Sequence, residues 1–143
     1  MSEELKMQPS ETYKKVINDY WGSRGDMKKY TLSEKYGFID SNGRKEGPWF
    51  QSSAREYRIT HYHRDVTHGT FTSQYLNGQT MFTGEFVNGR KEGPWKQWNE
   101  DGTPNADLNY LNDLLHGECI YYGTVGSKPL ICNYCNGEQL AQE

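Results

Sequence analysis

The octapeptide Asn-Gly-Arg-Lys-Glu-Gly-Pro-Trp occurs twice in this chain, first as residues 42–49 and again as residues 88–95. The second copy starts 46 residues after the first. Eight identical residues do not recur by chance in a chain of 143 residues. Because a fixed period changes the interpretation of the whole sequence, we look for the repeat before assigning any helix or strand.

Three columns of residues show that the offset contains two units. One glycine column advances in steps of 22, 24 and 24 residues, a second glycine column advances by 24, and so does an aromatic column. In that order the columns are Gly47, Gly69, Gly93 and Gly117; Gly78, Gly102 and Gly126; Tyr62, Phe86, Tyr110 and Tyr134. Each unit therefore has two glycine positions, which we interpret as turns, and two aromatic-bearing segments.

A period near 24 residues fits a β-hairpin. Two strands of about five or six residues and two turns account for it. Asp101-Gly102 and Asn112-Asp113 supply residues that readily adopt the positive φ angles of tight turns. A helical repeat would place two glycines inside each period, and a proline as well in two of the units. Each glycine would destabilise the helix by about 1 kcal/mol and each proline by about 3 kcal/mol, so a helical repeat is excluded. The shorter first step predicts a tighter turn between Trp49 and Tyr57, a segment without glycine.

The residues ahead of the repeats have a helical pattern. Their apolar positions fall on one helix face, with Ser10 as N-cap and Gly22 as the stop. We interpret this helix as a cap over the end of the array, and docking on a partner is the alternative. The predicted fold is mainly β, an elongated single-layer antiparallel β-meander of about four hairpin repeats with an N-terminal α-helical cap. Residues 1–35 form the cap and linker, 36–137 the repeats and 138–143 the tail.

Composition narrows the function classes. Hydrophobic residues make up 34% of the chain and mean hydropathy is -1.00, yet 14% of residues are aromatic, so we expect the chain to fold around rings. A net charge of -3 argues against nucleic-acid binding. No apolar run is long enough to span a bilayer, and the first residues do not resemble a signal peptide. Three cysteines do not suggest a secreted disulfide framework, so a cytoplasmic protein with reduced thiols is expected.

The unit resembles the MORN repeat, the membrane occupation and recognition nexus motif, and is most similar to the bacterial branch described as antitoxin-like. The resemblance covers about residues 36–137. The best matches are Gly93-Pro94-Trp95 with Trp98 and Gly102, and His116-Gly117 with Tyr121 and Tyr122. Phe71 and Cys119 depart from the pattern, because tryptophan is expected at both positions.

The resemblance implies a curved sheet that acts as a scaffold or binding platform without enzymatic activity. In the antitoxin-like branch the implied partner is a toxin that the repeat protein neutralises. Some MORN proteins associate with anionic phospholipids, but the acidic balance of this chain argues against a membrane partner.

Two sets of aromatic residues compete for the role of partner surface. Because side chains alternate along a strand, Trp95 and Gln97 should face one way and Lys96 and Trp98 the other. The column Trp49, Phe71, Trp95 and Cys119 is predicted to form the core. Tyr75, Trp98 and Tyr122, near the hairpin ends, are the predicted partner-binding set, with packing within the fold as the alternative. Arg90 and Lys91, in the turn repeated from Arg44–Glu46, could steer an acidic partner or simply be solvated.

No catalytic residues and no cofactor are predicted. The main alternative is a zinc site formed by His116, Cys119, Cys132 and Cys135, whose spacing suits a tetrahedral metal. His61, His63 and His68 form a weaker pattern that we interpret as a polar strand face. The glycine-containing segment 123–128 resembles a phosphate loop but lacks its spacing, so it is interpreted as the fourth hairpin turn.

These observations predict a non-enzymatic module that binds, and neutralises or inhibits, a toxin or other effector protein. The alternatives are a scaffold or adaptor linking partners or a membrane, and a small zinc-stabilised domain. Self-association through the last strand, which ends near Cys135, is a further alternative unless residues 139–143 fold over that edge.

Overall fold

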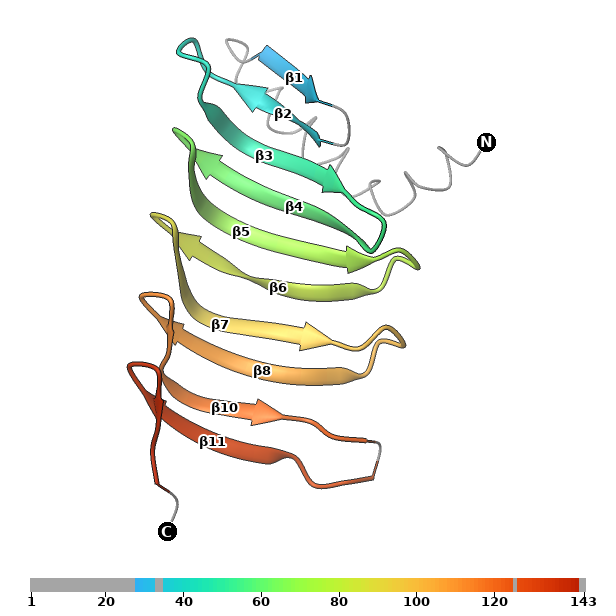
Figure 1. Cartoon of the computed structure of the whole chain (residues 1–143), viewed down its shortest axis with the longest axis vertical. Helices are drawn as coiled ribbons and strands as arrows, with labels where there is room; N and C mark the ends of the chain where they lie inside the picture. The colour runs from blue at the N-terminus through green and yellow to red at the C-terminus, as the bar shows by residue number, and fades with distance from the viewer. Residues whose placement is uncertain (1–27, 33–34, 125, 142–143) are drawn as a thin grey trace.

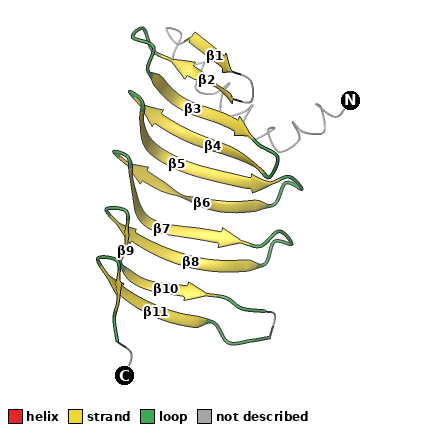
Figure 2. Cartoon of the chain, in the orientation of Figure 1, coloured by secondary structure: helices red, strands yellow, loops and turns green. Residues whose placement is uncertain are grey.

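The structure is a computed structural model that describes residues 28–32, 35–124 and 126–141. In these residues the chain forms one 12-stranded sheet in which neighbouring strands run antiparallel. Nearly every strand pairs with the strands before and after it in sequence, so the chain winds as a meander (Figure 1). Figure 2 shows strands and turns, with no helix in the described part of the chain. The predicted mainly β, single-sheet architecture is confirmed.

The strands follow the predicted hairpins. β3 and β4, β5 and β6, β7 and β8, and β10 and β11 form the four repeat hairpins, and β9 pairs only with β8. The strands are β1 (Lys28–Leu32), β2 (Lys35–Ile39), β3 (Lys45–Ser52), β4 (Glu56–His63), β5 (Val66–Tyr75), β6 (Thr80–Val87), β7 (Arg90–Trp98), β8 (Pro104–Leu111), β9 (Leu114–Leu115), β10 (Gly117–Tyr121), β11 (Leu130–Cys135) and β12 (Glu138–Gln139).

The sheet extends past both predicted limits of the repeats. The predicted helix at residues 10–21 lies outside the described residues. β1 lies within residues 1–35, which the sequence assigned to cap and linker, and β12 lies beyond residue 137. β1 pairs with β2 over Lys28 to Leu32. It carries neither a column glycine nor a repeat tryptophan, so the periodicity could not reveal it.

Two-residue turns connect consecutive units along one edge of the sheet, which we call the inter-unit edge. At Asn112 and Asp113 the φ angles are 51° and 72°, as a turn of this kind requires at both central residues. The same conformation occurs at Arg64-Asp65, Asn88-Gly89 and Asn136-Gly137. These turns return at a spacing of 24 residues and set the period. The opposite, mid-unit edge carries the turns with Gly78, Gly102 and Gly126, as predicted.

The first glycine column was wrongly interpreted as turns. Gly47, Gly69 and Gly93 lie inside strands, with φ angles of 79°, 114° and 76°, and Gly117 is the first residue of β10. The pairing register with the preceding strand shifts beside these glycines, for example between Thr60 and Tyr62 on β4. They are therefore bulge residues, and glycine is used because the bulge needs a positive φ angle.

The short first step has two sources. Ser53 N–H donates to the carbonyl of Glu56, three residues further on, whereas in the next hairpin Tyr75 N–H donates to the carbonyl of Gln79, four residues further on. The next hairpin also has a register shift between Ser73 and Gln74, and the β3–β4 pair has none. One missing turn residue and one missing bulge residue account for the difference, so the predicted tighter turn is confirmed as half of the cause.

The tryptophans of the repeated octapeptide lie flat on glycines of the preceding strand. A Cβ atom at Gly37 would overlap the Trp49 ring, and one at Gly84 would overlap the Trp95 ring. The indole N–H groups donate to the carbonyls of Phe38 at 2.9 Å and Glu85 at 3.1 Å. Most of the predicted core column is buried: Trp49 is 5%, Trp95 3% and Cys119 0% exposed, while Phe71 is half-buried.

Candidate functional site

The pairing register divides the side chains between two faces. Trp49, Thr60 and Phe71 are successive cross-strand partners and share one face, and Trp95 pairs with Leu108 on the same face. Rings meet across the strands: Phe71 and Phe86 centroids are 5.8 Å apart, and Phe86 and Trp95 centroids 5.1 Å. Trp95 continues the row to Tyr110 at 6.0 Å. We call this the aromatic face and the opposite side the polar face. From β2 to β4 the polar face also carries the buried rings of Phe38, Phe50 and Tyr57.

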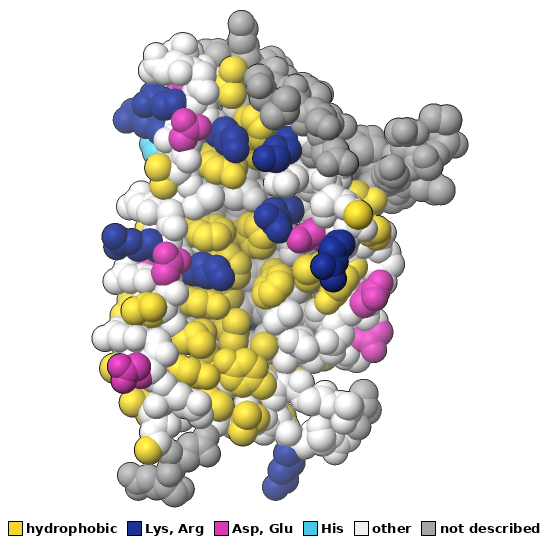
Figure 3. All heavy atoms as spheres, viewed as in Figure 1, with side chains coloured by type: hydrophobic (Ala, Val, Ile, Leu, Met, Phe, Trp, Pro, Cys, Tyr) yellow, Lys and Arg dark blue, Asp and Glu magenta, His cyan; other side chains and the backbone are white. Residues whose placement is uncertain are grey.

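The aromatic face is only partly shielded from solvent. Its half-buried residues include Phe71, Phe82, Phe86, Leu108, Tyr110 and Tyr121. Leu130, which pairs with Tyr121, is 58% exposed. Hydrophobic side chains gather in one broad area over β5 to β11 in Figure 3, with Lys and Arg side chains beside them. An area of this kind on a single-layer sheet is a candidate docking surface.

Two lysines from the repeated octapeptide lie over rings of the aromatic face. Lys45 Nζ is 5.1 Å from the Trp49 ring and 4.8 Å from the Tyr62 ring. Lys91 Nζ repeats the arrangement over Trp95 at 5.1 Å and Tyr110 at 4.9 Å. The ring faces attract the ammonium groups. The octapeptide thus places a cation at the same position in alternate units.

The polar face carries the opposite charge. Asp107 lies between Lys96, whose Nζ is 4.0 Å from its Oδ1, and Tyr122, whose hydroxyl donates to its Oδ2 at 2.8 Å. That hydrogen bond raises the pKa of Tyr122 above its ordinary value, because it favours the protonated hydroxyl. The basic residues that the register places on this face are Arg90 and Lys96. They are outnumbered by the acidic residues Glu46, Glu85, Glu92, Asp107, Glu118 and Glu138. An anionic partner is therefore favoured on the aromatic face and disfavoured on the polar face.

The predicted partner-binding set does not form one surface. Trp98 and Tyr122 occupy the same column and lie on the polar face, as the predicted alternation of Lys96 and Trp98 requires. Tyr75 follows Gln74, the column-mate of Trp98, and lies on the aromatic side. The Tyr75 hydroxyl donates to the Trp98 carbonyl at 2.7 Å, and burial, aided by Glu100 and Asp101, raises its pKa. Periodicity alone could not separate the two columns, because they differ by one residue.

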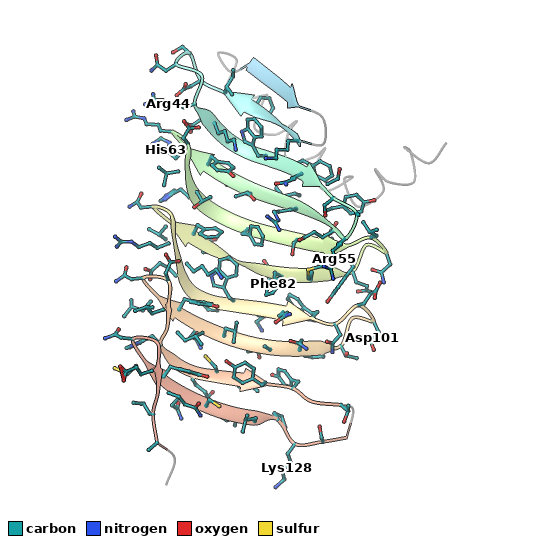
Figure 4. The ribbon with its side chains drawn as sticks, viewed as in Figure 1. Arg44, Arg55, His63, Phe82, Asp101 and Lys128 are labelled. Atoms are coloured by element: carbon teal, nitrogen blue, oxygen red, sulfur yellow. The ribbon has the colours of Figure 1, made fainter. Side chains whose placement is uncertain are left out.

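The two predicted basic residues also separate. Arg90 is exposed at the start of β7, and its register with Val87 places it on the polar side of the inter-unit edge. Lys91 is half-buried on the aromatic face. Figure 4 shows the same edge at Arg44 and His63, and the mid-unit edge at Arg55 and Asp101.

The inter-unit edge is held by side chains that bond to turn backbone. Glu46 accepts from Arg64 N–H at 3.0 Å and Glu92 from Asn112 N–H at 2.7 Å. In the alternate junctions a histidine replaces the glutamate: His68 Nδ1 accepts from Asn88 N–H and His116 Nδ1 from Asn136 N–H. The glutamate of the repeated octapeptide therefore has a structural role in joining units.

Of the four residues considered as zinc ligands, only two lie next to each other in the structure. Cys119 and Cys132 are cross-strand partners and buried. Cys135 is exposed and points to the opposite face from Cys132, since it lies three positions further along the same strand. His116 accepts from Asn136 N–H through Nδ1. Within the part of the chain that the structure describes, no three His, Cys, Asp or Glu residues lie close enough to hold a metal ion.

Thiol labelling tests this placement of the cysteines. Cys135 should react with a maleimide about tenfold or more faster than Cys119 and Cys132, which are 0% and 3% exposed. Mass spectrometry of timed samples counts the labels, and the Cys135→Ser variant should lose the fast label. Equal rates for all three thiols in the folded protein would contradict the burial of the pair.

Ser73 is a buried polar group on the aromatic face. It is 1% exposed, lies between Arg58 and Phe82 in the register, and its hydroxyl has no hydrogen-bond partner among the described residues. An unsatisfied buried hydroxyl destabilises the folded state. Ser73→Ala should therefore raise the free energy of unfolding by about 1 kcal/mol, measured by urea denaturation.

Ser53 provides the matched control for Ser73. Its exposed hydroxyl accepts from Arg55 and Glu56 N–H, both at 3.2 Å, and so closes the tight first turn. Ser53→Ala should lower the free energy of unfolding by about 1 kcal/mol. The interpretation of Ser73 fails if both alanine variants destabilise the protein equally.

An open pocket of about 770 Å³ lies at the mid-unit edge, between the ends of the third and fourth hairpins. Its polar side chains bond to one another: Asn105 Nδ2 donates to Asn99 Oδ1, and Thr103 Oγ1 donates to Asp101 Oδ1. The bonds from Thr103 hold the pKa of Asp101 below its ordinary value. These hydrogen bonds hold the turns together.

The comparisons with known proteins leave the family open. No protein-family model and no curated protein matches the chain. Among solved structures it is similar to a mutant of S. aureus TarM in complex with Fondaparinux, alpha-GlcNAc-glycerol and UDP, with 16% identity, a TM-score of 0.46, and coverage of 89% of this chain and 26% of that chain. It is also similar to a second crystal structure of TarM, with 15% identity, a TM-score of 0.45, and coverage of 81% of this chain and 23% of that chain. The chain spans about a quarter of either protein, and a similarity at this level carries no functional inference.

Among the described residues, no helix is long and apolar enough to cross a membrane.

Proposed function

We propose that this chain is a non-catalytic protein-binding module that engages its partner through the aromatic face. The observation that carries the proposal is the row of rings from Phe71 to Tyr110, which pack edge to face. Trp95 is buried, and the other three rings of the row are half-buried. Aromatic side chains bury a large area with few rotamers to order, which favours them at protein interfaces.

The finer proposal follows the MORN-like repeat pattern. In this view the chain is a cytoplasmic antitoxin-like or inhibitor protein that covers the working surface of a toxin or other effector. The open single-layer sheet supports this role, because it presents a long, pre-ordered surface whose binding orders little backbone. Binding by occupation requires no catalytic residues and no cofactor.

An adaptor is the second candidate, and one observation favours it. The two faces differ in chemistry: the aromatic face carries rings and lysines, and the polar face carries Asp107, Glu118 and Trp98. An adaptor would use both faces and bind two partners independently. An inhibitor would lose its partner when one face alone is changed.

Affinity capture from the native host with two matched double variants tests both candidates. Phe82→Ala with Leu130→Ala reduces the aromatic face, and Trp98→Ala with Tyr122→Ala reduces the polar face. Circular dichroism first confirms that both variants fold. Loss of one stoichiometric protein only in the aromatic-face variant supports the inhibitor proposal, and loss of different proteins in the two variants supports the adaptor. Capture of no protein, or capture unaffected by the aromatic-face variant, contradicts the proposed function.

A further inference from the structure

We infer that the segment bound by the aromatic face is acidic and amphipathic, with apolar side chains against the rings and carboxylates against Lys45 and Lys91. This inference rests on the proposed function and specifies the partner of the same face. Four observations carry it: the state of the two ammonium groups, the charge difference between the faces, the apolar area beside the lysines, and the spacing of the lysines.

Among the residues that the structure describes, no carboxylate pairs with either of the two ammonium groups. Within the described part of the chain, the ion pairs involve Arg44, Arg58, His63 and Lys96, and neither Lys45 nor Lys91 is among them. Each ammonium lies over two rings, which occupy one side of it. Its remaining N–H donors can bind a carboxylate on the open side. The rings also restrict the lysine stems, so less side-chain freedom is lost when an anion binds.

The charge of the surrounding face selects an anion. Arg58 also lies on the aromatic face, with its Cζ 5.8 Å from the Phe71 ring, but its guanidinium pairs with Glu56. The uncompensated positive charge of this region is therefore that of Lys45 and Lys91. On the opposite face the acidic residues outnumber the basic residues Lys96 and Arg90. A negatively charged segment is therefore attracted to the aromatic face and repelled by the polar face, so charge determines which side it binds.

The apolar area beside the lysines indicates that the partner segment also carries apolar side chains. The lysines lie toward the inter-unit edge, over Tyr62 and Tyr110, while Phe82, Tyr121 and Leu130 continue the face toward the mid-unit edge. A uniformly acidic chain would leave these apolar groups uncovered. A segment with one apolar side and one acidic flank matches both regions at once.

The distance between the two lysines sets the minimum length of the partner segment that contacts both. Lys45 lies on β3 and Lys91 on β7, four strand positions further along the sheet. At about 4.8 Å per strand the two ammonium groups are about 19 Å apart. A helix covers that distance in about 13 residues, and an extended segment in about six. Either is an ordinary length for a docking segment.

A face-to-face pair of two copies fits this surface less well. Two aromatic faces in contact would bring the lysines of one copy toward those of the other, and like charges in an interface oppose association. The same lysines would bind an anionic bilayer, so a lipid surface must be an arm of the test.

The experiment uses the full chain and a synthetic amphipathic helical peptide of about 24 residues, or ~36 Å, with leucine on one side and glutamate on the other. A second peptide carries glutamine in place of every glutamate. Titration calorimetry should give affinity for the glutamate peptide about tenfold or more above that for the glutamine peptide, and this difference should shrink at high salt. Vesicles of phosphatidylcholine with phosphatidylserine test the lipid surface, and sedimentation tests self-association.

The matched variants keep the fold and remove only the charge. Lys45→Met with Lys91→Met retains unbranched side chains over the rings, and should weaken glutamate-peptide binding about tenfold. Lys96→Met, on the polar face, is the control and should bind like the wild type. Lys45→Arg with Lys91→Arg keeps the charge and should retain binding.

Each outcome decides the inference. Equal affinity for the two peptides, or unchanged affinity in the double methionine variant, overturns it. So does tighter binding to phosphatidylserine vesicles than to the peptide, or a dimer whose formation needs Lys45 and Lys91. If a native partner is captured through the aromatic face but the methionine variant still captures it, the inference fails and the proposed function stands. If the glutamate peptide binds as expected and no native protein is captured, the proposed function fails and the acidic specificity stands.

Discussion

Replacing Gly84 with alanine is expected to lower the free energy of unfolding by about 3 kcal/mol. A Cβ atom at this position would overlap the Cδ2, Cε2 and Cγ atoms of the Trp95 side chain, which is 3% exposed. The ring cannot yield without losing its contacts with Phe86 and Tyr110 and its hydrogen bond to the Glu85 carbonyl. Urea denaturation followed by tryptophan fluorescence measures the change.

Gly78→Ala is the matched control. Gly78 has a φ angle of 94° and no atom near its missing side chain, so alanine there tests backbone strain alone, at about 1 kcal/mol. Gly84 has no positive φ angle, so alanine there tests the ring contact alone. If Gly84→Ala destabilises the protein no more than Gly78→Ala, Trp95 does not lie on the β6 backbone. A partial recovery in Gly84→Ala with Trp95→Leu would confirm that the two positions interact.

The period predicted the hairpins because the turns impose it. Asn112-Asp113 and Gly102 are turn residues in the structure, as their positive φ angles show. Hairpin turns need such angles wherever they occur, so their residue types are visible in sequence. The order of the strands followed, since short connections join neighbouring strands.

The bulge glycines were misread because a glycine column reports a positive φ angle and not its cause. Gly93 adopts a φ angle of 76° within β7, and Gly102 one of 91° in a turn. The two are indistinguishable by residue type. The pair Asn88-Gly89, four residues before Gly93, already supplied the turn, and that duplication was the sequence feature which could have separated them.

The candidate site was predicted least well, because it depends on which face each residue occupies. A one-residue shift moves a side chain to the other face, and Tyr75 and Trp98 differ by such a shift within the repeat. The sequence ranked Lys91 as a solvated or steering charge, but its ring contacts depend on the bulge beside it. Bulges change the register locally, so the faces could be assigned only once the pairing was known.

The two tryptophans of β7 are expected to differ strongly in how much free energy of unfolding is lost when each is replaced by alanine. Trp95→Ala should lower the free energy of unfolding by about 4 kcal/mol, because a buried indole that contacts Phe71, Phe86 and Tyr110 is removed. Trp98→Ala should cost about 1 kcal/mol, because Trp98 is half-buried and its bond with Tyr75 uses the backbone carbonyl, which alanine retains.

Urea midpoints of the two variants, with Trp95→Phe as an intermediate, measure this contrast. Trp95→Phe keeps a ring on Gly84 but loses the bond to the Glu85 carbonyl, so it should fall between wild type and Trp95→Ala. The aromatic face is both core and candidate docking surface. Trp95→Ala should therefore abolish binding of the proposed partner because the protein unfolds, whereas Phe82→Ala with Leu130→Ala should abolish binding while the protein stays folded. Equal destabilisation by Trp95→Ala and Trp98→Ala would mean that both faces are packed to the same degree. The assignment of the core around Trp95 to the aromatic face would then be wrong.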